Sequence, residues 1–198
     1  MNTDFSPFPI LRTDRLVLRS LELDDAQAIQ KLRSDARVNE FLDRAATNNL
    51  DEAVAFIKII QKSVEEGDSM YWAITCDDVL IGTICLYNWD KKNDIAEIGY
   101  ELKVDAQGKG YMSEAIRAVI YFAFKTMCVK TITAFPKQGN VKSIQLLEKN
   151  NFVLDNTFKF KSELDANGYL VYYFNSCSLS ESRITLIAQE MIDMASLI

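Results

Sequence analysis

The first third of the chain carries one strand pattern followed by two helical patterns. Residues 15–22 (RLVLRSLE) alternate apolar and polar side chains, which predicts a half-buried strand. Residues 23–35 have helical spacing, with Asp24 as the expected N-cap, and a second helix is expected from Asn49 or Asp51 to a stop at Gly67. The pattern therefore predicts the order strand, helix, helix before residue 70.

Three strand patterns follow in close succession, over residues 71–76, 79–89 and 94–104. The short segments CDDV and WDKKND between them have the polar composition of hairpin turns. Strands joined by hairpins pair in opposite directions, so these three predict an antiparallel meander.

The last part of the chain alternates helical and strand patterns. Helices are expected over residues 108–127, 140–152 and 181–198, and strands over 130–135, 152–163 and 168–176. Asn140 is the expected N-cap of the middle helix, and Asn151 occupies the place of a left-handed residue at its end. A meander that feeds a β-α-β crossover predicts an α/β mixed sheet, mainly antiparallel, with helices on both faces.

One domain over residues 1–198 is the simplest organisation, because the chain has no internal repeat and no linker rich in Pro, Gly or Ser. Its core is expected at about residues 10–176, with 181–198 as a helical extension. Apolar residues of that extension recur every three or four positions, which predicts one buried stripe. The stripe could pack on its own domain, pack on a second subunit or stay disordered, so a monomer and a homodimer both remain open.

Composition narrows the choice of function. The net charge of −6 argues against nucleic acid as a partner, and no apolar run is long enough to span a membrane. Four scattered cysteines and the lack of a secretory signal at the start favour a cytoplasmic protein. The chain has no histidine, which removes Ser-His and Cys-His nucleophile pairs and histidine metal sites, and we expect no metal.

Two glycines flank a lysine in the segment QGKGYMS, between a predicted strand and a predicted helix. Glycine allows a left-handed backbone, and the first amides of a helix have no internal partner, so such a turn can cradle a phosphate. A tight turn that merely needs glycine is the alternative. Gly110 follows Lys109 where a P-loop needs Ser or Thr, and Ser113 stands where a dinucleotide fingerprint needs glycine.

The segment from Gln107 to Met112 resembles the Gln/Arg-x-x-Gly-x-Gly/Ala signature of the GNAT acetyltransferases. Three further segments, LRTDRLVLRSLELDD, AEIGYEL and NVKSIQLLEKNNF, resemble motifs of the RimJ/RimL branch, in the right order over about residues 10–175. Three positions depart from the family pattern. Met112 replaces a small residue, Asn151 replaces a glycine, and Leu147 stands where many members carry a tyrosine that acts as general acid.

The resemblance implies a GNAT acyl-CoA N-acyltransferase fold that uses acetyl-CoA, held by the amides of the glycine loop and by backbone groups of the preceding strand. It implies that Ser143 protonates the CoA thiolate, and that Asn140 holds the pantetheine arm. The expected cofactor-binding residues are Leu102, Lys103, Val104, Gln107, Gly108, Lys109, Gly110, Tyr111, Met112, Ser113, Asn140 and Lys142. Lys109 and Lys142 could meet the 3′-phosphate or could be solvated surface lysines.

Amine acetylation needs a base, because a free alkyl amine is protonated near neutral pH. Glu97 is the best candidate, since a carboxylate is conspicuous in the apolar strand DIAEIGYEL, and the resemblance implies a base there. Glu101, on the same strand face, is the reserve. Alternatively, Glu97 lies on a solvated strand face, Asn140 is only an N-cap, and Ser143 is only a helix-surface hydroxyl.

The expected acceptor is a primary amine, with a protein N-terminus favoured by the resemblance and a small amine, such as a polyamine or an aminoglycoside, next. A CoA-binding sensor or scaffold without catalysis is a second hypothesis. A cysteine-based acyl carrier using Cys85 is a third, and it is disfavoured because no histidine is present to activate the thiol.

Overall fold

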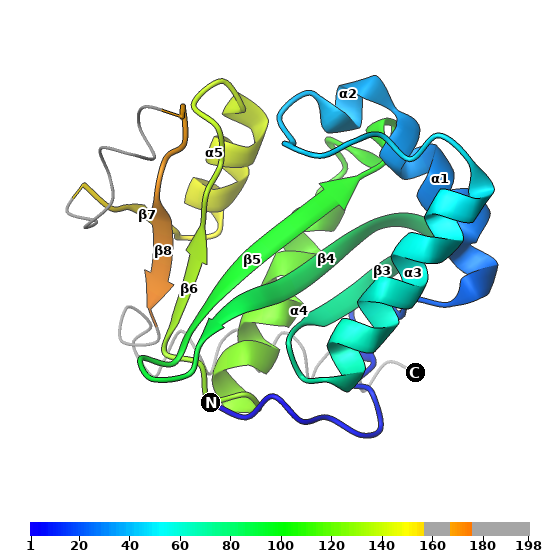
Figure 1. Ribbon diagram of the computed structural model, residues 1–198. Coiled ribbons are helices and arrows are strands. Elements are labelled where there is room, and N and C mark those ends of the chain that lie inside the picture. The colour runs from blue at the N-terminus through cyan, green and yellow to red at the C-terminus, as the bar shows by residue number, and fades with distance from the viewer. Residues whose placement is uncertain (157–166, 176–198) are drawn as a thin grey trace.

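The computed structural model describes residues 1–156 and 167–175, which form one mixed sheet with helices on both faces (Figure 1). The strands of this part are β1 Leu11–Arg12, β2 Val17–Ser20, β3 Met70–Cys76, β4 Val79–Asp90, β5 Ile95–Leu102, β6 Thr131–Ala134, β7 Val153–Leu154 and β8 Tyr172–Asn175. The helices are α1 Ala26–Ser34, α2 Ala36–Asn39, α3 Leu50–Glu65, α4 Tyr111–Lys125 and α5 Val141–Lys149, with short 3-10 turns at Leu23–Asp25 and Val104–Ala106.

The described strands lie in the order β1-β2-β3-β4-β5-β6-β8-β7. Neighbours from β1 to β5 pair antiparallel, which confirms the hairpin pattern predicted for β3, β4 and β5, and β6 pairs parallel to β5. The crossover from β5 to β6 runs through α4, which makes the pair parallel. The predicted mixed, mainly antiparallel sheet is confirmed.

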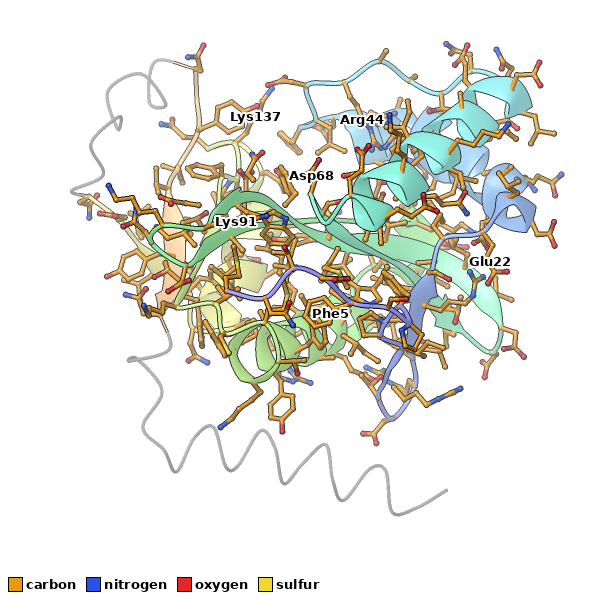
Figure 2. All side chains as sticks on the ribbon, turned by 60° about the horizontal axis from the view of Figure 1, so that its bottom comes forward. Phe5, Glu22, Arg44, Asp68, Lys91 and Lys137 are labelled. Carbon is orange, nitrogen blue, oxygen red and sulfur yellow. The ribbon has the colours of Figure 1, made fainter. Side chains whose placement is uncertain are left out.

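Two hydrophobic clusters lie on opposite faces of the sheet. Helices α1 and α3 cover one face, where Ile29, Leu32 and Ile57 pack against β3. Helix α4 covers the other face, and its apolar stripe packs with the buried Trp72 of β3. The N-terminal segment packs against this second cluster, and the centre of the Phe5 ring lies 5.1 Å from the centre of the Phe122 ring (Figure 2). Both faces of the sheet are therefore covered, which explains why its central strands are so apolar.

Local capping decides where the helices begin. Asn49, rather than Asp51, caps α3, because its side-chain oxygen accepts a hydrogen bond from the backbone amide of Glu52. Asn140 caps α5 in the same way, with the backbone amide of Ser143 as donor. The expected cap at Asp24 is wrong. The first turn is closed by a capping box between Glu22 and Asp25, in which the amide of Glu22 donates to the Asp25 carboxylate at 2.9 Å.

Asn151 has a φ of 65°, the left-handed conformation expected at this position. The four-residue helix α2 was not predicted, because so short an element has no readable periodicity. The expected helix 181–198 and most of the expected strand 152–163 lie outside the described residues.

Candidate active site

A cleft of about 860 Å³ opens at the centre of the sheet. It exists because β5 and β6 pair with each other only from Ile95–Thr131 to Glu97–Thr133 and separate beyond that point. Helix α2 and the segment after it form one wall, α5 forms the other, and the end of β5 and the loop before α4 complete the lining. Figure 1 shows β5 running up between α5 and α2.

The loop before α4 needs its two glycines. Gly108 and Gly110 have φ values of 75° and 83°, a left-handed backbone that other residues adopt only at a cost. Gly110 is the N-cap of α4 and has no side chain with which to cap it, so the first amides of α4 are left for another partner. The helix dipole places partial positive charge at the same point, which makes this end of the cleft suited to an anion.

The side chains of Gln107 and Ser113 connect this loop to β5 and α5 by hydrogen bonds. The side-chain nitrogen of Gln107 donates to the Leu102 carbonyl at 3.1 Å, and the side-chain oxygen accepts from the Lys142 ammonium at 3.3 Å. This one side chain therefore connects β5 with α5. The Ser113 hydroxyl donates to buried Asn150 at 3.0 Å. The hydroxyl of Ser113 is therefore used in holding α4 against α5, and its backbone amide is the group left for a ligand.

Most of the residues expected from the sequence lie at the cleft. Its lining includes Leu102, Val104, Gln107, Gly108, Gly110, Tyr111, Met112, Ser113, Asn140, Lys142 and Ser143. Lys103 lies outside it, because its amide donates to Ile81 and its ammonium to Leu80 on the β4 side. Lys109 is exposed outside the cleft lining, and Met112 is 6% exposed because it packs into the core.

Tyr100 is a hydroxyl that sequence reasoning did not single out. It lies on β5 and lines the cleft, with its oxygen 2.9 Å from the Ser143 oxygen on α5. Burial raises the pKa of Tyr100 to about 12, partly opposed by the bond with Ser143, so the phenol keeps its proton at neutral pH. Leu147 is buried in the core. The structure thus brings the hydroxyls of Ser143 and Tyr100 together at the first turn of α5.

Glu97 lies outside the cleft lining, at the last paired position before β5 and β6 separate. Two donors from β4 hold its carboxylate: the hydroxyl of Tyr87, and the amide of Asn88 at 2.8 Å. Asn88 has a φ of 49° where the β4–β5 register shifts, and such a bulge re-aims a side chain. Burial and then the bond with Glu97 raise the pKa of Tyr87, which keeps Tyr87 a donor.

Glu101 is buried and lines the cleft, but its carboxylate is fully engaged. It forms an ion pair with Arg44, lies 3.7 Å from a guanidinium nitrogen of Arg33, and accepts the Thr83 hydroxyl at 3.2 Å. Burial and the charge of Arg44 lower the pKa of Arg33, while Glu101 opposes that change. This carboxylate therefore neutralises two partly buried cations.

The segment after α2 is attached to both sides of the strand opening. Arg44 reaches Glu101 on β5, whereas the neighbouring Asp43 pairs with Lys137 and accepts the Tyr169 hydroxyl on the β6 and β8 side. Arg44 and Lys137 are labelled in Figure 2. The segment thus spans the opening between the two halves of the sheet.

Among residues 1–156 and 167–175, no three His, Cys, Asp or Glu side chains gather as a metal site would require. None of the helices in this described part is both long and apolar enough to cross a membrane.

The sheet thus splits at its parallel pair, and a glycine-flanked helix start lies on one wall of the opening. A model of the acetyltransferase (GNAT) domain family matches residues 15–153, and the chain belongs to that family. The protein is therefore an N-acetyltransferase.

Known relatives agree with this assignment. The chain is 34% identical over 145 residues to the N-acetyltransferase p20 of Bacillus licheniformis, covering 72% of this chain and 81% of p20. It is 30% identical over 105 residues to the ribosomal-protein-serine acetyltransferase of Escherichia coli (strain K12), covering 52% of this chain and 59% of that protein. The ribosomal L7/L12 alpha-N-protein acetyltransferase RimL, solved in complex with coenzyme A, shares the fold with a TM-score of 0.74 and 20% identity, covering 84% of this chain and 98% of that chain.

Proposed function

We propose that this N-acetyltransferase binds acetyl-CoA in the cleft and acetylates the primary amine of a protein N-terminus, which approaches from the Glu97 side of the sheet. The observation that supports this most directly is the separation of β5 and β6 beyond Glu97 and Thr133. An opening between two strands connects the two faces of a sheet, so two substrates can meet there from opposite sides.

The cleft residues fit a CoA thioester in both charge and shape. The amides of residues 108–113 and the dipole of α4 offer an anion site for the pyrophosphate, with Lys142 as a nearby cation. Backbone groups of Leu102 and Val104, together with Asn140, line the route that the pantetheine arm would take. The bound thioester supplies the acetyl group and leaves as a thiol.

Glu97 is the better of the two candidate bases. Glu101 already balances the charges of Arg33 and Arg44, and withdrawing it from them would leave two partly buried cations unpaired. Within residues 1–156 and 167–175, the donors to Glu97 are the neutral groups of Tyr87 and Asn88, which orient the carboxylate without neutralising it. We assign to Glu97 the removal of the proton from the acceptor amine, directly or through one water.

Ser143 and Tyr100 are the proton donors available for the leaving sulfur. When the Tyr100 hydroxyl donates to the Ser143 oxygen, the Ser143 hydroxyl is free to donate into the cleft. Tyr100 is thus a positioning residue for Ser143, and Ser143 is the group that would face the sulfur.

The names of two relatives support a protein acceptor. One is a ribosomal-protein-serine acetyltransferase and the other an alpha-N-protein acetyltransferase of ribosomal L7/L12. A small amine remains the competing acceptor, and turnover assays with N-terminal peptides, polyamines and aminoglycosides decide between the two. Turnover of a peptide amine with an efficiency well above that of every small amine is the expected result.

The decisive variant is Glu97→Gln, which keeps the size of the side chain and its capacity to accept the Tyr87 hydroxyl. We expect turnover at neutral pH to fall by about 10²–10⁴-fold while the acetyl-CoA affinity stays the same, since only the base is lost. The loss should shrink as the pH rises and the acceptor amine deprotonates unaided. Wild-type rates across the pH range in this variant would place the base elsewhere, and CoA binding without turnover of any amine would contradict catalysis itself.

A further inference from the structure

The turn between β1 and β2 lies against the first turn of α4, about a hundred residues further along the chain. Glu114 of α4 is 6% exposed and receives donors from two residues of this turn. The Thr13 hydroxyl donates to Oε1 at 2.5 Å, and the Arg15 amide donates to the same oxygen at 3.0 Å. The Arg15 guanidinium takes the other oxygen, with Nε at 2.8 Å and Nη2 at 2.6 Å. The Glu114 carboxylate is therefore held on both oxygens by Thr13 and Arg15.

The same guanidinium also contacts the glycine loop. Its Nη1 donates to the Lys109 carbonyl at 3.0 Å, and its central carbon lies 4.6 Å from the centre of the Tyr111 ring. Between these two contacts, a Cβ on Gly110 would stand 3.5 Å from Nη2. Arg15 thus touches the residues on both sides of Gly110 and the first turn of the helix that Gly110 begins.

The contacts of Arg15 restrict a loop that is otherwise flexible because of its two glycines. Gly108 and Gly110 allow the left-handed backbone, but glycine also has the most conformational freedom to lose when it is ordered. Gly108 has open space where a Cβ would lie. A contact from outside the loop is the means by which its amides can be kept aligned before a ligand binds.

The Glu114 carboxylate supports the contact electrostatically. Burial by itself raises the pKa of Glu114, but the hydrogen bonds from Thr13 and Arg15 outweigh burial and hold the pKa below its ordinary value. The same bond raises the pKa of Arg15. Both partners are therefore charged at neutral pH, and the pair is anchored in the first turn of α4.

We propose that Arg15, fixed by Glu114 and Thr13, is a positioning residue that holds residues 109–111 in the conformation in which their amides bind the CoA phosphates. Arg15 itself acts through the loop rather than on the cofactor. The proposal rests on the proposed function, because it takes CoA to be the ligand of this loop.

A second ion pair of the same protein provides a matched control. Arg19 on β2 holds Asp25 through two bonds of 2.8 Å, and Asp25 is 7% exposed, as buried as Glu114. This pair is away from the cleft lining. Arg15→Gln and Arg19→Gln therefore each take a guanidinium away from a buried carboxylate, one next to the glycine loop and one elsewhere, with the arginine side chains 46% and 26% exposed.

The experiment measures CoA affinity by calorimetry and thermal unfolding for wild type, Arg15→Gln, Glu114→Gln and Arg19→Gln. We expect Arg15→Gln to weaken CoA binding about tenfold, the equivalent of disordering roughly one backbone residue, and to raise KM for acetyl-CoA with kcat nearly unchanged. Arg19→Gln should lower the melting temperature comparably and leave CoA affinity within about twofold of wild type.

Glu114→Gln separates positioning from simple charge attraction. It removes a negative charge near the phosphate site, so charge alone predicts tighter CoA binding, whereas loss of the anchor predicts weaker binding. Tighter binding in Glu114→Gln, or unchanged binding in Arg15→Gln, overturns this inference while wild-type CoA binding keeps the proposed function intact. A wild-type protein that does not bind CoA overturns both.

Discussion

Replacing Glu101 by glutamine removes one negative charge from a buried site that also holds two positive charges. The side chain of Glu101 is 6% exposed, and those of Arg33 and Arg44 are 14% and 20% exposed. Glutamine keeps the length of glutamate and one acceptor oxygen for Thr83. The change therefore tests the charge of Glu101 and not its volume.

The expected cost follows from the state of the two arginines. Removing one partner of a buried ion pair costs about 3–5 kcal/mol, and because both guanidinium groups retain some access to water we take the lower end, about 3 kcal/mol. Burial and Arg44 already lower the pKa of Arg33, and the loss of Glu101 removes the charge that opposes them. For a domain of this size the melting temperature should fall by about 6–12 °C.

Differential scanning calorimetry of Glu101→Gln measures this cost, with Glu97→Gln as the control. Both glutamates lie on β5, but the partners of Glu97 are the neutral side chains of Tyr87 and Asn88, so its replacement should cost no more than about 1 kcal/mol. A double variant with Arg44→Gln should lose less than the sum of the single variants, since it removes one of the two unpaired charges. A melting temperature for Glu101→Gln within about 2 °C of wild type would refute the reasoning that Glu101 is committed to the arginines.

Two further predictions concern the lining of the cleft. Tyr100→Phe removes the hydroxyl beside Ser143, and we expect kcat to fall about 2–10-fold with CoA affinity unchanged, the worth of one hydrogen bond; steady-state kinetics that show no change would remove Tyr100 from the mechanism. Gly82→Ala would place a Cβ 2.4 Å from the Glu101 carbonyl and 2.7 Å from a Leu102 methyl, so β5 must shift. We expect the free energy of unfolding to fall by about 1–3 kcal/mol and CoA binding to weaken. A variant equal to wild type in both measurements would show that a shift of β5 affects neither stability nor CoA binding.

Most elements of the fold could be predicted from the sequence because their causes are local. Strand patterns separated by polar turn segments mark β3, β4 and β5, and helical spacing marks α3 and α4. Caps such as Asn49 and Asn140 act on amides three residues away. The glycine loop is also local, since its left-handed residues and the helix start that follows are neighbours in the chain.

The environments of the candidate catalytic groups could not be predicted in this way. Glu97 and Glu101 share one strand face, and the strand pattern does not distinguish them. Their difference comes from Arg33 and Arg44, which lie in the first quarter of the chain and reach Glu101 only through the packing of α1 and the segment after α2. Charge balance at a buried carboxylate depends on every element packed against it, and sequence spacing reports none of these neighbours.

The elements, the glycine-flanked helix start and the groups available for chemistry can be read from the amino-acid sequence, because each depends on interactions within a few residues. Which groups meet depends on how the chain packs in three dimensions. Tyr100 contacts Ser143 from 43 positions away, and Arg15 contacts Glu114 from 99 positions away. The cleft itself exists only where β5 and β6 stop pairing. Such contacts follow from strand order and helix packing, which are properties of the folded chain as a whole.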